Sequence, residues 1–187
     1  MTVRPRYLTL IPTGERAHSC AGEFARLHAL ARELCTDGFP AEETRELEPL
    51  YAHLPLKLVR DLRQEVAEKL GLDPGIMPLD KFSIHGCGAV SRHDDKHNYP
   101  GVYFIIVVAH SGRLGITDGA SRARRHEPGE ILLLDPHKPH ALLPEGRTPR
   151  QHPYERTHSP VRDPEEQFMF LCFDVKRPLL RQRFRAG

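Results

Sequence analysis

The sequence lacks long apolar runs. None approaches the roughly 20 residues that a transmembrane helix requires, and the N-terminal stretch offers only about six apolar-leaning residues, too few for a signal peptide. The cysteines Cys20, Cys35, Cys87 and Cys172 form no Cys-x-x-Cys pair, which argues against a structural zinc module and against a disulfide framework. These absences lead us to expect a soluble protein of the reducing cytoplasm, without a membrane partner.

The chain also lacks a strong excess of charge of one sign. It carries 27 Lys and Arg residues against 25 Asp and Glu residues, so the overall charge does not favour a polyanionic partner. Basic runs do occur at residues 122–126 and in a C-terminal tail, residues 177–187. Such runs are usually solvated surface, and we therefore do not expect nucleic-acid binding.

A length of 187 residues fits one well-packed domain, and the sequence shows neither an internal repeat nor a second domain boundary. Residues 1–75 form a mostly helical N-terminal part that begins with a short strand at residues 7–11. Apolar residues at three- and four-residue spacing predict helices over residues 19–35 and 55–70. The acidic stretch between them, residues 36–48, is interpreted as a loop or a short helix.

From residue 78 to residue 176 the pattern changes to short strands separated by turn signals such as Pro128-Gly129. Short strands without intervening helices indicate an antiparallel sandwich or barrel. The sequence thus predicts a mainly β core braced by the N-terminal helices. The expected strands are residues 81–85, 101–109, 113–117, 130–134, 140–143 and 167–175.

Two polar segments, residues 91–97 and 134–140, lie beside these expected strands and carry the clearest chemical signal. Residues two apart in a strand face the same side, so His93 and Asp95 could grip one ion. His140 follows a buried strand that would deliver it to an adjacent edge. Two histidines and one carboxylate suit a non-haem iron with open coordination positions. The chain has 12 histidines, however, so a chance His-x-Asp match is not rare.

This pattern resembles the iron(II)- and 2-oxoglutarate-dependent dioxygenases, whose core is a double-stranded β-helix, or jelly roll. The resemblance covers residues 81–143 and implies that His93, Asp95 and His140 are the metal ligands of Fe(II). It further implies 2-oxoglutarate as cosubstrate, O2 as oxidant and hydroxylation as the reaction, because halogenating members lack the carboxylate. The motifs that carry it are His93-Asp94-Asp95, the strand 102–109, Pro128-Gly129-Glu130 and Lys138-Pro139-His140.

The family also places a basic residue about ten positions after the distal histidine, where a guanidinium can bind both oxygens of the far carboxylate of 2-oxoglutarate. Arg150 stands at this distance and is our first choice, with Arg147 second. Because the last strand begins late, Arg156 or Arg162 could serve instead. Tyr103, on the strand after the His-x-Asp motif, could add a hydroxyl to the cosubstrate site.

The substrate is not identified by the sequence. A basic, partly aromatic loop over residues 148–166 would suit an anionic small molecule, an amino acid or an acidic peptide. The residues that give the loop this character are Arg150, His152, Tyr154, Arg156, His158 and Arg162. The oligomeric state is not indicated either.

Two alternatives remain open from the sequence. One is a cupin-type dioxygenase or isomerase that does not use 2-oxoglutarate, which would gain support if His97 replaced His93 as a ligand. The other is a non-enzymatic binding module on a jelly-roll scaffold with incidental histidines. Whether His97 or His137 joins the metal site is also left open by the sequence.

Overall fold

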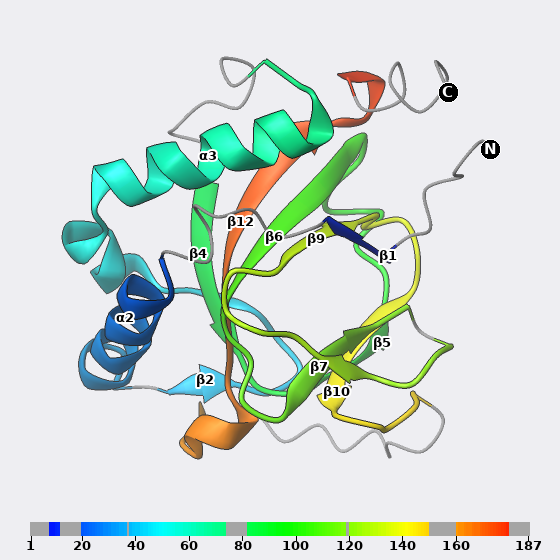
Figure 1. Ribbon diagram of the computed structural model, residues 1–187. Coiled ribbons are helices and arrows are strands. Elements are labelled where there is room, and N and C mark those ends of the chain that lie inside the picture. Colours follow the sequence, from blue (N-terminus) through cyan, green and yellow to red (C-terminus); the bar gives the residue numbers. More distant parts are fainter. Residues whose placement is uncertain are drawn as a thin grey trace.

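The computed structural model describes residues 8–11, 20–36, 38–73, 82–118, 120–149 and 160–179. Two antiparallel sheets face one another, and two helices cover the outer face of the larger sheet (Figure 1). The expected mainly β jelly roll braced by helices is confirmed. None of the described helices is both long enough and apolar enough to cross a membrane.

The sheets are built from strands that lie far apart in the sequence. The large sheet has the order β1 (Leu8–Ile11), β9 (Ile131–Leu134), β6 (Val102–His110), β12 (Phe168–Lys176), β4 (Phe82–Cys87), β3 (Arg45–Glu46). The smaller sheet has the order β5 (Val90–His93), β10 (His140–Pro144), β7 (Leu114–Thr117), β8 (Arg124–Arg125). A separate pair joins β11 (Pro160–Val161) to β2 (Phe39–Pro40).

The large sheet is buried on both faces. Along β6, Ile105 and Val107 pack in the core beneath the helices, whereas Phe104 and Ile106 pack in a second core between the two sheets. Successive side chains of a strand point to opposite faces, so an unbroken apolar run fills both cores at once. This is why β6, β9 and β12 are apolar along most of their length.

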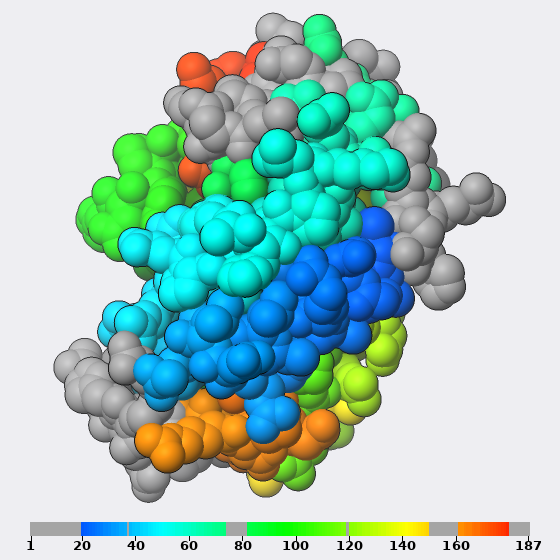
Figure 2. Space-filling model, turned by 90° about the vertical axis from the view of Figure 1, so that its left-hand side faces the viewer, coloured from blue at the N-terminus to red at the C-terminus, as the bar shows by residue number. Residues whose placement is uncertain are grey.

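The helices close the outer core. Helix α2 (Ala21–Leu34) and helix α3 (Leu56–Leu70) agree closely with the predicted ranges, and a 3-10 helix, η1 (Glu48–His53), lies between them. Gly71 ends α3 in the left-handed conformation, with φ of 58°, which a glycine adopts without steric cost. Figure 2 shows these helical segments, in blue and cyan, side by side over this face of the molecule.

Two local predictions were wrong or incomplete. Residues 36–48 are neither a loop alone nor a short helix, because they contribute β2 and β3. Strand β3 pairs with β4 at the edge of the large sheet, where the N–H of Leu47 donates to the carbonyl of Ile84 at 2.8 Å. Strand β5 was not predicted as a separate strand. A further 3-10 turn, η4 (Pro164–Glu166), precedes β12.

Close backbone approach between β7 and β8 makes Gly115 a sensitive position. A Cβ atom there would lie 2.1 Å from the carbonyl oxygen of Arg124. We expect Gly115→Ala to lower the free energy of unfolding by about 1–3 kcal/mol, measured by urea denaturation. The matched control, Gly22→Ala, adds a methyl group in open space on α2 and should be neutral or stabilising by up to about 1 kcal/mol. Equal effects of both substitutions would contradict this account.

Candidate metal centre

The two histidines of the site come from neighbouring strands of the smaller sheet. His93 ends β5, His140 begins β10, and the two residues are direct partners in the antiparallel register. Their ring centroids lie 4.3 Å apart with the planes tilted by 60°. Strand pairing alone therefore brings the two imidazoles together.

Asp95 reaches the same point from a turn. Its N–H donates to the carbonyl of Pro136 at 2.7 Å, and its own carbonyl accepts from the N–H of Tyr99 at 3.0 Å. Its Oδ2 lies 3.4 Å from Nε2 of His140 and 3.8 Å from Nε2 of His93. The predicted cluster is present, but the reason given for it was wrong, because Asp95 lies beyond the end of β5 and strand alternation does not place it.

The neighbouring carboxylate, Asp94, has a different environment. Its Oδ2 lies 3.2 Å from Nζ of Lys96, and this hydrogen bond lowers the pKa of Asp94. Asp94 is thus occupied by a surface partner, while Asp95 faces the histidines.

Hydrogen bonds fix which nitrogen of each histidine is available. Nδ1 of His93 lies 2.7 Å from the carbonyl of Ser91, and Nδ1 of His140 lies 2.9 Å from the carbonyl of Lys138. A carbonyl oxygen only accepts, so each Nδ1 must carry the hydrogen. In a neutral imidazole, Nε2 then keeps a lone pair, and both lone pairs converge on the carboxylate of Asp95. A bound cation would relieve the repulsion between these lone pairs and the negatively charged carboxylate.

The donor atoms of His93, Asp95 and His140 all lie within 4.8 Å of one another, and in the described part of the chain they form the one group of His, Cys, Asp or Glu side chains suited to hold a metal ion. Two imidazoles and one carboxylate suit non-haem ferrous iron. Backbone carbonyls that orient ligating histidines are also usual at metal sites. The residues present fit the expected ion. We name these three residues the triad.

One short loop, residues 135–139, supports two members of the triad. Its Lys138 carbonyl orients the ring of His140, and its Pro136 carbonyl accepts from the backbone of Asp95. The loop itself is anchored by Asp135, whose Oδ1 accepts from the N–H of His137 at 2.9 Å. Displacing this loop would therefore move two ligands at once.

Asp135 also forms an ion pair with Arg177 at the end of β12. The side chains of both residues are only 11 % exposed, and Nη2 of Arg177 contacts Oδ1 of Asp135. The guanidinium lies over the ring of Tyr103, 4.7 Å from its centroid. The sequence placed Arg177 in a solvated basic tail, which is wrong for this residue, because its side chain is buried in an ion pair.

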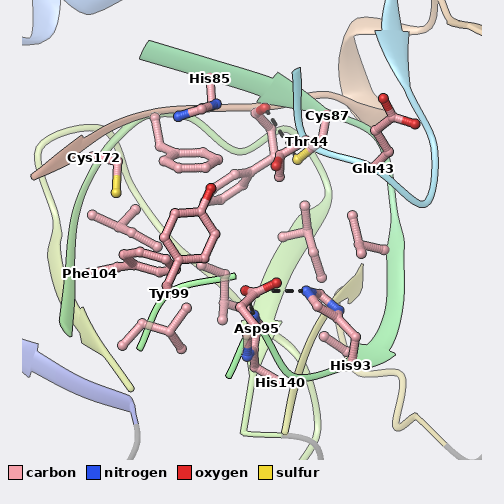
Figure 3. A pocket seen from close by; sticks show the side chains of 18 of the residues that line it. Glu43, Thr44, His85, Cys87, His93, Asp95, Tyr99, Phe104, His140 and Cys172 are labelled. Carbon is pink, nitrogen blue, oxygen red and sulfur yellow. Dashed lines mark hydrogen bonds and ion pairs between the residues drawn. The ribbon is translucent and has the colours of Figure 1, made fainter. Parts of the chain in front are cut away.

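The triad lies at one end of a cavity of about 380 Å³ between the two sheets (Figure 3). Apolar and polar side chains share its wall. Figure 3 shows Asp95, His93 and His140 together at one end, with His85 and Thr44 at the other. The volume is at the small end of the range of about 300–1,000 Å³ that is usual for small-molecule sites. The apolar residues of the wall are Val90, Phe104, Ile106, Ile116, Leu134, Ala141, Leu142, Phe168 and Phe170.

The expected cosubstrate residues are not brought to the triad. Arg147 is exposed on the turn after β10, at the opposite end of that strand from His140, and does not line the cavity. Tyr103 faces the outer core, not the cavity. Arg162 lines a separate cavity of about 360 Å³. The first choice, Arg150, lies outside the described residues, as does Arg156.

Two further histidines lie near the triad without joining it. His97 is exposed, and Nε2 of His137 lies 3.3 Å from the carbonyl of Tyr99. Neither belongs to the metal-binding group within the described residues.

Sequence reasoning missed two residues that line the cavity, Arg92 and Tyr99. Arg92 is the residue before His93 on β5. Its position beside a proposed ligand was a usable signal, but the family pattern places the basic residue after His140. Tyr99 lies four residues after Asp95 in a turn, where no periodic pattern indicates the direction of a side chain.

No protein-family model and no curated protein matches the chain. Among solved structures, it is similar to EvdO2 from Micromonospora carbonacea var. aurantiaca, with a TM-score of 0.54 and 13% sequence identity over 95% of this chain and 94% of that chain. It is also similar to EvdO2 complexed with 2-oxoglutarate, with a TM-score of 0.53, 12% identity and the same coverage. The fold is shared. At this level of identity, the likeness extends no further than the fold.

We expect His93→Ala, Asp95→Ala and His140→Ala each to weaken ferrous iron binding by roughly 100-fold or more, because each removes one of three protein ligands. Anaerobic titration with iron measures the affinity. Asp94→Ala is the matched control, since it removes a neighbouring carboxylate that faces Lys96 and should leave one ion bound per chain. Undiminished iron uptake by Asp95→Ala would show that the ligand set is wrong.

The loop anchor gives a separate prediction. Asp135→Asn keeps an oxygen for the N–H of His137 but removes the charge that faces Arg177. We expect iron to bind about 10- to 100-fold more weakly, and the free energy of unfolding to fall by about 1–3 kcal/mol. Asp163→Asn, which breaks the exposed pair with Arg113, is the control and should cost no more than about 1 kcal/mol. Wild-type iron affinity in Asp135→Asn would argue against the role of the loop.

Proposed function

We propose that this chain is a non-haem iron(II)- and 2-oxoglutarate-dependent dioxygenase that hydroxylates a small molecule. The observation that carries the proposal is the convergence of Nε2 of His93, Nε2 of His140 and the carboxylate of Asp95 at one end of a cavity. The fold likeness to EvdO2, of which one crystal structure is a complex with 2-oxoglutarate, supports the choice of cosubstrate.

His93, Asp95 and His140 would hold the ion from one side and leave its remaining positions open toward the cavity. Bound ferrous iron supplies the redox chemistry, in which one oxygen atom of O2 enters a C–H bond of the substrate and the other enters succinate, while 2-oxoglutarate loses CO2. The protein contributes fixed ligands, because the carbonyls of Ser91 and Lys138 prevent the two imidazoles from turning.

The other residues that line the cavity determine the polarity around the triad. The apolar side chains between the sheets line part of the cavity and would exclude water from that part of its wall. Arg92 lines the same cavity and can pair with a carboxylate of 2-oxoglutarate. It replaces Arg147 as our choice among the described residues for that role.

The scarcity of positive charge in the cavity favours a second candidate, a cupin-type metal-dependent oxygenase that does not use 2-oxoglutarate. Arg92 is the one Lys or Arg among the described residues that line the cavity, and it is exposed. A dicarboxylate that enters an apolar cavity requires compensating charge. An oxygenase that acts directly on an uncharged substrate requires no compensating charge.

Succinate formation distinguishes the candidates. The iron-loaded protein is supplied with O2 and 2-oxoglutarate, with and without a panel of small molecules, and succinate and oxygen consumption are measured. We expect iron-dependent succinate formation that is lost in Asp95→Ala and kept in Asp94→Ala. Oxygen consumption that depends on iron and a panel compound but not on 2-oxoglutarate would establish the second candidate instead. No uptake of iron at stoichiometric concentration would favour a non-enzymatic binding module.

A further inference from the structure

Apart from the triad, the cavity wall carries no positive charge away from solvent among the described residues. Four other charged side chains line it: Glu42, Glu43, Arg92 and Asp174. The carboxylate of Glu42 is occupied by Ser91, accepting from its N–H at 2.9 Å and its hydroxyl at 2.8 Å. The other three are exposed to solvent. An anionic group bound deep in the cavity would thus lose its hydration without gaining an ionic partner there, and a cationic group would meet, outside the triad, a single carboxylate, Glu42, whose oxygens already accept from Ser91.

The titratable groups deeper in the wall are neutral. Burial lowers the pKa of His85, so its imidazole is uncharged at neutral pH, and the ring stacks on Phe170 with centroids 5.4 Å apart. Burial raises the pKa of Cys87 to about 12 and also raises that of Cys172, which keeps both thiols protonated. The wall can therefore offer hydrogen bonds and apolar contact, but little charge.

One hydroxyl points into this space. The ring of Tyr99 meets Phe104 edge-on, with centroids 4.8 Å apart and planes at 81°. Figure 3 shows the Tyr99 hydroxyl directed into the cavity between Asp95 and His85. It has no hydrogen-bond partner among the described residues. A phenol is protonated at neutral pH, so this hydroxyl can donate a hydrogen bond.

From this arrangement, and building on the proposed function, we propose that the substrate is an uncharged ring compound bearing a carbonyl, hydroxyl or ether oxygen. Its ring lies against Phe104 and Phe170, and its oxygen accepts a hydrogen bond from Tyr99. Aromatic side chains favour flat apolar partners through offset or edge-on contact. This class differs from the anionic substrate suggested by the loop 148–166, most of which lies outside the described residues.

Binding of matched probes tests the class of ligand. We would compare 2-acetylnaphthalene, which is neutral, with 2-naphthoate and 2-naphthylmethylammonium, which have similar shapes and opposite charges. Dissociation constants are measured by calorimetry on the full chain carrying Asp95→Asn after chelation of metal, so that neither a bound ion nor the Asp95 carboxylate can hold a charged probe. We expect the neutral ketone to bind at least about tenfold more tightly than either ion. A charged probe that binds as tightly as the ketone, or failure of the ketone to bind, would overturn the proposal.

Two tyrosine variants test the hydrogen bond. Tyr99→Phe keeps the ring against Phe104 and removes only the hydroxyl, and it should weaken 2-acetylnaphthalene binding about five- to tenfold while leaving naphthalene binding unchanged. Tyr103→Phe removes a hydroxyl outside the cavity and should change neither. Equal affinity of Tyr99→Phe and wild type for the ketone would refute the role of this hydroxyl.

A third variant tests the ring contact. Phe170→Leu keeps an apolar side chain and should weaken binding of both naphthalene and the ketone about threefold or more, with folding checked by thermal denaturation. Wild-type affinity in a folded Phe170→Leu protein would count against this contact. These measurements need neither turnover nor iron nor 2-oxoglutarate. Their failure would leave the proposed oxygenase chemistry intact, and failure of iron uptake would not affect them.

Discussion

The register between β5 and β10 is the constraint on which the site depends. It places His93 directly opposite His140, and a slip of one residue would turn one imidazole to the other face of the sheet. The β5–β10 pairing is itself irregular between His140 and Leu142. Regular pairing of β10 with β7, from Ala141 to Pro144, fixes β10 independently. The smaller sheet thus acts as a frame that presents two members of the triad at one edge.

The third member of the triad depends on contacts with the larger sheet. Asp95 is held by the loop 135–139, which leaves the end of β9 and is fastened to β12 through Arg177. A buried ion pair contributes little net stability, because desolvation of two charges offsets their attraction. Here the pair matters more for geometry than for stability. It connects the ends of β9 and β12 to the loop 135–139, which contacts two members of the triad. In this way both sheets contribute to one site.

The parts of this fold that local pattern specifies were predictable from the sequence. Helices α2 and α3 follow from apolar spacing, and the longer strands from apolar runs between turn signals. Strands β2 and β3 have two residues each and form only through partners distant in the sequence. Strand β5 has one buried apolar residue, Val90, and gives too short a pattern to detect.

For the site, sequence order was enough to select the triad, but not the residues around it. Strand β6 is apolar on both faces, so its sequence does not say which face Tyr103 joins. The sequence also does not show that Arg177 is buried. In a basic run, an arginine in a buried ion pair cannot be distinguished from a solvated one. Side-chain direction in turns and charge pairing between the ends of distant strands are tertiary properties, and Tyr99 and Arg177 depend on them.

Charge balance links the proposed cosubstrate to the proposed substrate class. With ferrous iron and 2-oxoglutarate bound as proposed, the ion, the carboxylate of Asp95 and the cosubstrate dianion together carry one net negative charge. Arg92 can neutralise that charge, after which the described cavity wall has no cation left to offer. An anionic substrate would then be unmatched in an apolar enclosure, while an uncharged one preserves the balance. The single arginine thus suits 2-oxoglutarate together with a substrate that adds no further negative charge, and the two proposals are consistent with each other.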